Sequence, residues 1–365
     1  MMRRENTRQV GYSILLICEG TRTEPNFFYE LTHDGDKCSL PVGSVRIMPK
    51  PVIESADEQT QSDRGNNCRQ RRKLGSTSDL NDDLKGSNPF PGPQPLNWVR
   101  AGQENLDTFD EVWCIFDKDG HPRQKEAFEL ADKIKAEGKN LNIALSSRCI
   151  EYYFLLHFEY IFKAFEKSEC NEKRSGKSVS FRCMTDEALP GACDGSKCVN
   201  GYARCRKYWK ESKKTESLYK LLSDKLFVAF RNSEKLRRES ETVVGSDTAF
   251  YERNPYIYNT DTLVARLMGY TLWSTKNPLE IISGLTRLRL SIDNDSLVVY
   301  NAGEGAYCLT ADFLSFFNVH TGKKMTVGGT SMFLSPGEDY KVRINSSADY
   351  AYVCNFDTKK YMFFV

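Results

Sequence analysis

Two short apolar segments, each ending in acidic residues, constrain the fold of this chain more than any other feature. Residues 14–17 lead into Cys18-Glu19-Gly20, and residues 112–116 lead into Asp117-Lys118-Asp119-Gly120. An unbroken apolar run of about four to eight residues is typical of a strand buried on both faces of a parallel sheet. The chain is therefore expected to contain an α/β sheet in which both segments are central strands.

The acidic residues after these segments predict a cation site. Ligands of open α/β sheets collect at the carboxyl ends of the strands. Glu19, Asp117 and Asp119 would meet there, and like charges repel unless a cation neutralises them. Mg²⁺ is the expected ion. The alternative is that these acids cap the next helix or form a turn, as Asp-Lys-Asp-Gly does readily.

The residues between and after the two segments alternate between helix and strand patterns. Helices are expected over residues 23–31, 95–105, 123–137 and 152–165, and strands over residues 45–48 and 142–146. Short connections between such elements predict a parallel sheet. Glu151 opens the last helix just after a strand, where it is expected to reach the same edge as Asp117. The alternative is that Glu151 only favours the helix N-terminus through the helix dipole. His157, inside that apolar helix, is interpreted as a core residue with one satisfied nitrogen.

Three blocks of sequence resemble a known family in their order and spacing. The blocks are residues 18–28, 109–119 and 149–159, with Asn254-Pro255 and residues 262–267 matching a closing helix. Together they resemble the RloB-like proteins, a branch of the Toprim superfamily found in bacterial restriction and phage-defence loci. The resemblance implies a Toprim-like parallel sheet flanked by helices, with a Glu and Asp-x-Asp site for Mg²⁺.

The resemblance also implies an activity and its residues. The leading hypothesis is a metal-dependent nuclease that hydrolyses DNA or RNA, tRNA included. Its catalytic residues would be Glu19, Asp117, Asp119 and Glu151, and its Mg²⁺ or Mn²⁺ ligands Glu19, Glu24, Asp117 and Asp119. The alternative is a non-catalytic sensor or nucleic-acid-binding module that partners a defence ATPase. Relatives are often encoded beside such an ATPase, and a homo-oligomer is a further alternative.

The chain departs from the family pattern in three regions. Residues 54–95 form a polar insertion, residues 166–206 form a cysteine-rich insertion, and residues 269–365 follow the resembling part as a second domain after residues 1–268. The first insertion carries the basic residues Arg69, Arg71, Arg72 and Lys73. Such a cluster either contacts nucleic-acid phosphates or forms a solvated face.

The cysteine-rich insertion has two interpretations. Cys183, Cys193, Cys198 and Cys205 would give it folding energy by holding structural Zn²⁺. Their spacings are wider than those of most zinc sites, so unligated thiols are the alternative. Residues 163–240, which overlap this insertion, hold 19 Lys or Arg against 11 Asp or Glu. This local excess contrasts with a net charge of +2 for the whole chain.

The C-terminal part has a different pattern of apolar residues. Apolar residues alternate at 288, 290 and 292, at 340, 342 and 344, and from 350 to 356, with turn residues between them. This period of two predicts an antiparallel β module. The module either binds a partner or ligand or covers the α/β sheet.

Composition excludes a membrane protein. No apolar run approaches the roughly 20 residues of a membrane span. Cys18 and Cys114 fall inside the expected core strands, where a free thiol acts as a small apolar residue. A reducing cytoplasm is therefore the expected location.

Overall fold

The computed structural model describes most of the chain in two compact units. The described residues are 12–41, 43–51, 94–118, 120–168, 171–174, 177–180, 197–209, 217–327, 330–345, 347 and 349–365. The first unit comprises residues 1–150 and 212–217, and the second comprises residues 151–211 and 218–365. The domain boundary expected between residues 268 and 269 lies inside the second unit and stays a prediction.

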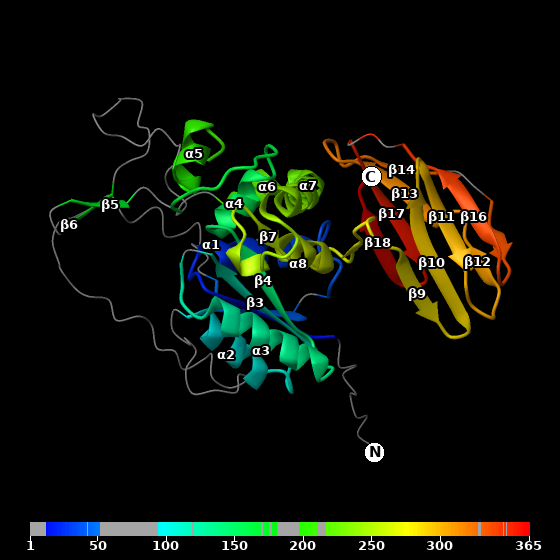
Figure 1. Ribbon diagram of the computed structural model, residues 1–365, viewed down its shortest axis with the longest axis horizontal. Coiled ribbons are helices and arrows are strands. Elements are labelled where there is room, and N and C mark those ends of the chain that lie inside the picture. Colours follow the sequence, from blue (N-terminus) through cyan, green and yellow to red (C-terminus); the bar gives the residue numbers. More distant parts are fainter. Residues whose placement is uncertain are drawn as a thin grey trace, which may run out of the picture. The chain divides into compact units, whose positions relative to one another are not determined.

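The first unit is built on a parallel sheet (Figure 1). Its strands are β1 (Ile14–Cys18), β2 (Val45–Met48), β3 (Glu111–Asp117) and β4 (Leu141–Ser146). They are hydrogen-bonded in the order β2-β1-β3-β4, and every pair is parallel. The two acid-terminated segments are therefore adjacent central strands, as the sequence predicts.

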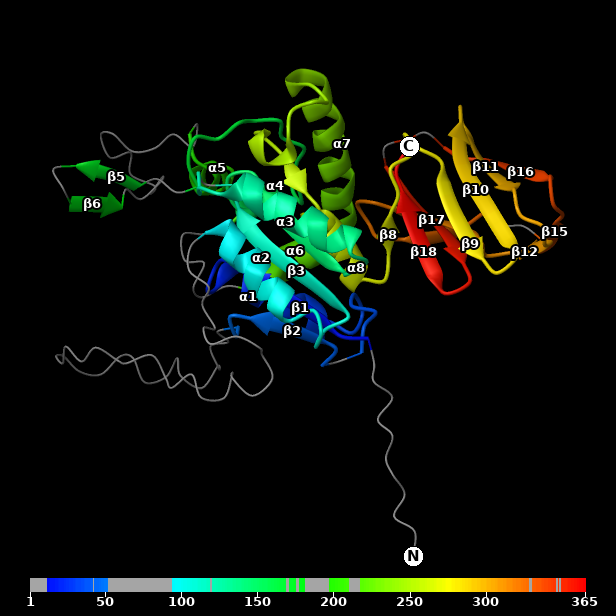
Figure 2. The same ribbon diagram turned by 60° about the horizontal axis from the view of Figure 1, so that its bottom comes forward.

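Three helices accompany this sheet, namely α1 (Thr23–His33), α2 (Pro95–Glu104) and α3 (Gln124–Ala136). Helices α2 and α3 pack side by side along β3 and β4 (Figure 2). Gly102 lets α2 approach the sheet, because a Cβ there would lie 3.0 Å from Cys114 Sγ. A glycine inside a helix costs stability, which the close packing offsets.

Two thiols of the central strands behave as apolar core residues, as predicted. Cys18 and Cys114 are fully buried in β1 and β3. Burial raises the pKa of both thiols, and Glu24 adds to the increase at Cys18. Neither cysteine is therefore a thiolate at neutral pH, and neither has the nucleophilic character of a reactive cysteine.

The second unit begins with helices and short strands. The helices are α4 (Ile150–Leu155), α5 (Val199–Cys205), α6 (Leu218–Leu222), η3 (Ser223–Lys225), α7 (Leu226–Val244), η4 (Phe250–Glu252) and α8 (Thr260–Leu267). The strands are β5 (Asn171–Arg174), β6 (Lys177–Ser180), β7 (Ile257–Tyr258) and β8 (Thr271–Leu272). In the part of the chain that the structure describes, no helix has the length and hydropathy needed to cross a membrane.

The helix expected over residues 152–165 is wrong in its length. Helix α4 ends at Leu155, and residues 159–165 follow a turn without regular structure. Side chains satisfy the backbone at this break: Asn232 Nδ2 donates to Leu156 O at 2.7 Å, and Tyr152 Oη donates to Ile161 O at 2.9 Å. Apolar character therefore marked a buried segment, and tertiary hydrogen bonds decided where its helix ends.

His157 lies in the turn after α4 and is a core residue, as interpreted from the sequence. It is buried, and its Nδ1 lies 3.1 Å from Tyr153 O. Because a carbonyl only accepts, Nδ1 carries the proton and Nε2 is left without a hydrogen-bond partner. Burial lowers the pKa of His157 to about 3.

This depressed pKa makes the fold sensitive to acid. An unfolded chain protonates its histidine below pH about 6.5, whereas the folded chain does not, so acid favours unfolding by about 1.4 kcal/mol per pH unit. Between pH 7 and pH 4.5 the wild type is expected to lose about 2 kcal/mol more stability than His157→Gln, which stays neutral. Urea denaturation of both proteins at the two pH values measures this difference. Parallel losses would contradict it.

Helices α7 and α8 are joined by buried charges. Arg237 donates from Nη1 to Asp261 Oδ1 at 2.9 Å, and its Nη2 lies 2.8 Å from Asp261 Oδ2 and 3.0 Å from Glu234 Oε2. The Asp261 side chain is 0% exposed, against 20% for Arg237. Burial alone would lower the pKa of Arg237, but Asp261 and Glu234 raise it.

The C-terminal β module follows β8. Its strands are β9 (Leu279–Ser283), β10 (Thr286–Asp293), β11 (Ser296–Asn301), β12 (Tyr307–Leu309), β13 (Leu314–Asn318), β14 (Lys324–Thr326), β15 (Met332–Leu334), β16 (Asp339–Arg343), β17 (Tyr350–Phe356) and β18 (Lys359–Phe363). They form sheets in the orders β16-β11-β10-β9, β12-β15 and β14-β13-β17-β18-β8. All pairs are antiparallel except β18 with β8.

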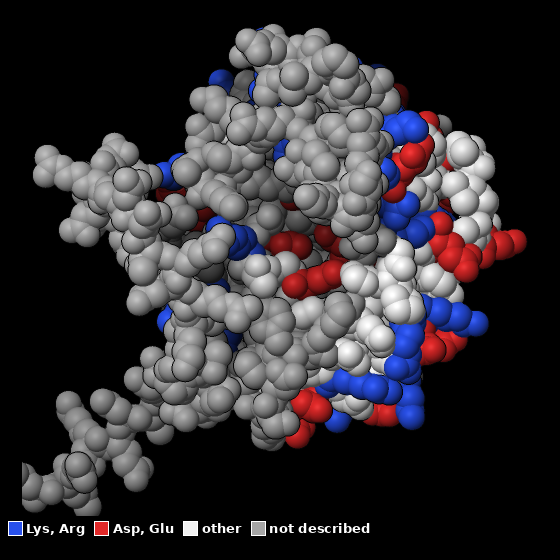
Figure 3. Space-filling model, turned by 90° about the vertical axis from the view of Figure 1, so that its left-hand side faces the viewer, with Lys and Arg blue, Asp and Glu red and all other residues white. Residues whose placement is uncertain are grey.

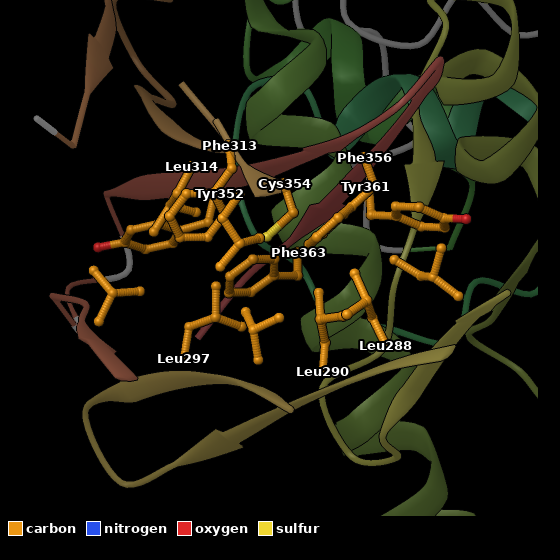
Figure 4. Close-up of a cluster of buried hydrophobic side chains, with 14 of the residues drawn as sticks. Leu288, Leu290, Leu297, Phe313, Leu314, Tyr352, Cys354, Phe356, Tyr361 and Phe363 are labelled. Carbon is orange, nitrogen blue, oxygen red and sulfur yellow. The ribbon is translucent and has the colours of Figure 1, made fainter. Parts of the chain in front are cut away.

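The predicted alternation places the core between the two larger sheets. Leu288 and Leu290 on β10 point toward Tyr352 and Phe363 from the facing sheet (Figure 4). Arg287, Arg289 and Asp293, at odd positions of β10, are exposed. The prediction of an antiparallel β module is thereby confirmed.

Candidate functional site

The acidic ends of β1 and β3 are in direct contact. Glu19 N donates to Ile115 O at 2.9 Å, which continues the strand pairing by one residue past β1. Asp117 N in turn donates to Glu19 Oε2 at 2.9 Å. The carboxylate of Glu19 is therefore fixed to the backbone of the other strand end. A charge-assisted bond of this kind is stronger than a neutral one.

His121 is a site residue that sequence reasoning missed. Its Nε2 lies 2.6 Å from Glu19 Oε1, and the two side chains are 21% and 18% exposed. A carboxylate accepts hydrogen bonds, so Nε2–H of the imidazole donates. The only sequence signal was its position, four residues after Asp117 and between a turn and a proline. Each oxygen of Glu19 thus has a donor, which fixes the orientation of the carboxylate.

The turn after β3 is anchored on both sides. Lys118 N donates to Ser146 O at 2.9 Å, and Arg148 Nη1 donates to Lys118 O at 3.3 Å. Gln124 at the start of α3 donates from Nε2 to Asp117 O at 3.3 Å. The backbone around Asp117 is therefore held by the β4 end and by α3. A site placed on such elements needs little rearrangement to bind a ligand.

Glu24 reaches Gly20, the residue after Glu19, from helix α1. It lies in the first turn of α1 and is 5% exposed. A Cβ at Gly20 would lie 2.0 Å from Glu24 Oε2, so the carboxylate packs directly against the Gly20 backbone. Only glycine leaves that space. The Glu24 carboxylate therefore lies against the residue that follows Glu19.

The remaining predicted site residues are not brought together by the described structure. Asp119 lies outside the described residues, as do Arg69, Arg71, Arg72, Lys73, Cys183 and Cys193. Glu151 is buried in α4, in the second unit. Cys198 is buried and caps α5, its Sγ accepting from Gly201 N at 3.2 Å. The zinc site and the roles of Asp119 and Glu151 stay predictions.

The side chains at the strand ends differ from a complete metal site but have the right donor atoms for a divalent ion. Among the described residues, no group of three or more His, Cys, Asp and Glu could hold a metal. Glu19, Glu24 and Asp117 nevertheless offer only carboxylate oxygen, which suits Mg²⁺ or Mn²⁺. Mg²⁺ takes one or two carboxylates and completes its shell with water and phosphate, so these donors fit it.

Acidic and basic side chains are interspersed over the described part of the face shown in Figure 3. The net charge of the whole chain is +2. Net charge therefore does not indicate an anionic ligand, and local clusters have to be considered.

The fold and the site define a parallel α/β protein with carboxylates at the ends of two adjacent strands. The model of the RloB-like protein family matches residues 14–267. This match spans more than half of the chain, and the chain belongs to the RloB-like family, as its three sequence blocks predict. No curated protein matches the sequence.

Proposed function

We propose that this chain is a metal-dependent nuclease with a Toprim-like site, which hydrolyses phosphodiester bonds of DNA or RNA. The observation that supports it best is the Glu19 carboxylate, fixed by Asp117 N at the ends of two adjacent parallel strands. Family membership supports it further through what the RloB-like resemblance implies. A Mg²⁺ ion held there would stabilise charge on the scissile phosphate and lower the pKa of water.

The chain's own residues would prepare the site. Glu19, Asp117 and Asp119 would hold the ion, and Glu24 and Glu151 would serve as further ligands or orient water. His121 and Asp117 N keep the Glu19 carboxylate in one orientation. Preorganised groups of this kind reduce the rearrangement that the reaction requires.

The biological setting is part of the same proposal. The resemblance to RloB-like proteins implies a role in bacterial phage defence, in the cytoplasm, with an ATPase from the same locus as partner. A defence nuclease must be kept inactive until infection, and a partner that switches it on would provide this control. The alternative function is a sensor that binds nucleic acid without cutting it.

The proposal is tested by incubating the purified protein with labelled plasmid, single-stranded DNA and total tRNA. Reactions contain Mg²⁺, Mn²⁺ or EDTA. Cleavage that requires a divalent ion is expected for at least one substrate. Binding without cleavage under every condition would favour the sensor instead.

Substitution of His121 tests its positioning of Glu19. His121→Ala is expected to weaken Mg²⁺ affinity roughly 10- to 100-fold, because partners that orient metal ligands contribute that much. His121→Gln keeps a side-chain donor and is expected to retain most of the affinity. Isothermal titration calorimetry measures binding, and cleavage at saturating Mg²⁺ should recover in the Ala variant. Equal losses in both variants would show that the imidazole has another role.

A further inference from the structure

Two segments of the second unit, one of which contains α5, together form one piece of surface. Residues 158–168 and 197–209 are joined by backbone hydrogen bonds: Glu166 N and Lys167 N donate to Lys197 O at 3.0 and 3.1 Å, and Val199 N donates to Lys167 O at 3.1 Å. Asn200 Nδ2 adds a bond to Ser168 O at 3.1 Å. We call these two segments the α5 surface.

The α5 surface carries an excess of positive charge. Its basic residues are Lys163, Lys167, Lys197, Arg204, Arg206 and Lys207, and its acidic residues are Glu159 and Glu166. Lys197 and Arg206 have side chains that are 67% and 57% exposed. Lys167 and Lys207 are exposed as well. Lys197 Nζ lies 3.9 Å from Glu166 Oε2, and Arg206 Nε lies 4.0 Å from Glu159 Oε1, so neither cation is in a close ion pair with that carboxylate.

Aromatic rings lie among these cations. Tyr208 stacks on Phe158 with centroids 4.4 Å apart and planes inclined by 8°. Lys225 Nζ lies 5.1 Å from the centroid of Phe158. Lys163 Nζ and Arg206 Cζ lie 5.6 and 5.4 Å from the centroid of the Tyr202 ring. Basic residues interleaved with stacked rings are the combination used by proteins that bind single strands.

Glu159 organises the two tyrosines. Tyr202 Oη donates to Glu159 Oε1 at 2.7 Å. Burial and a hydrogen bond to the same carboxylate raise the pKa of Tyr208 to about 12, and the same causes raise the pKa of Tyr202. Both hydroxyls therefore stay neutral at physiological pH. The shared Glu159 carboxylate therefore holds both rings in place.

We propose that the α5 surface binds single-stranded nucleic acid, with phosphates on Lys167, Lys197, Arg206 and Lys207 and a base stacked on Tyr208. An acidic peptide would satisfy the cations but offers no planar face for Tyr208, and a duplex keeps its bases stacked on each other. The inference rests on the proposed function in one respect, which is that the bound strand is taken to be the substrate of the nuclease.

The test measures binding apart from cleavage. An Asp117→Asn Asp119→Asn parent is mixed with labelled oligouridylate or oligothymidylate, and fluorescence anisotropy is followed over a range of salt concentrations. Lys167→Glu, Lys197→Glu, Arg206→Glu and Lys207→Glu together are expected to weaken binding roughly tenfold or more and to reduce the salt slope by about 3. Tyr208→Ala is expected to cost roughly tenfold, and Tyr208→Phe little.

A matched control reverses four exposed charges of the same kinds on the β module. Lys323→Glu, Lys324→Glu, Arg343→Glu and Lys359→Glu together are expected to leave affinity unchanged. Equal weakening by the control set, or parental affinity of the α5 set, would overturn the proposal. So would competition by polyglutamate as effective as that by oligouridylate, because the surface would then recognise charge alone.

Two further measurements keep the outcomes separate. If circular dichroism shows that the fourfold variant does not fold, Lys197→Gln with Lys207→Gln replaces it, and parental affinity of that pair would count against the surface. Oligonucleotide binding through the α5 surface without cleavage by the wild type would remove the nuclease proposal and keep the surface. Cleavage by the wild type together with unchanged oligonucleotide binding by the α5 variants would keep the nuclease proposal and remove the proposal for the α5 surface.

Discussion

Replacing Asp117 and Asp119 together by Asn is expected to reduce divalent-metal-dependent cleavage to background while leaving the protein folded. The amide keeps the shape of each side chain but removes the charge that holds Mg²⁺. Because like charges at the strand ends repel each other, stability without metal should be unchanged or higher. Cleavage of the active substrate and thermal melting without metal measure the two effects.

The control for this variant removes two exposed carboxylates that are not among the candidate site residues. Asp132 and Asp312 are exposed, and Asp132→Asn with Asp312→Asn should leave both cleavage and melting unchanged. Cleavage that persists in the Asp117→Asn Asp119→Asn variant would rule out metal binding at these acids. A large loss of stability without metal would instead assign them a structural role.

The sequence predicted the sheet and the contact between Glu19 and the Asp117 turn, because buried parallel strands have an unambiguous apolar pattern. Residues 14–17 and 112–116 do not alternate between apolar and polar residues. The acidic residues after them lie at the carboxyl ends of parallel strands, which meet at one edge of the sheet. His121 was beyond this reasoning. Its contact with Glu19 depends on the path of the turn after β3, which residues from β4 and α3 fix.

In the second unit, local sequence patterns do not predict where helix α4 ends. Residues 152–165 are apolar enough for a long helix, but Asn232 and Tyr152 bond to the backbone where the chain turns away. Asn232 is distant in sequence, and the bond from Tyr152 forms only once the chain has turned, so helical periodicity reports neither of them. The β module was predictable because a two-residue alternation and its turns are local. The buried pair of Arg237 and Asp261 had no local signal either.

Arg237→Met is expected to destabilise the protein by about 3–5 kcal/mol, the usual cost of leaving a buried charge without its partner. Asp261 is fully buried, and Arg237 binds both of its oxygens. Urea denaturation at pH 7 measures the loss. The adjacent Arg238→Met is the matched control: Arg238 is 39% exposed and bonds to Glu234 at 3.0 Å, so its removal should cost about 1 kcal/mol or less.

A second substitution separates the buried charge from the lost packing. If the unpaired Asp261 causes the damage, Arg237→Met with Asp261→Asn should be more stable than Arg237→Met alone by about 1–3 kcal/mol, since residues in contact do not contribute additively. Asn keeps the size of Asp and remains neutral when its partner is gone. A double variant no more stable than Arg237→Met would show that the arginine acts through packing between α7 and α8, and that its charge contributes little to stability.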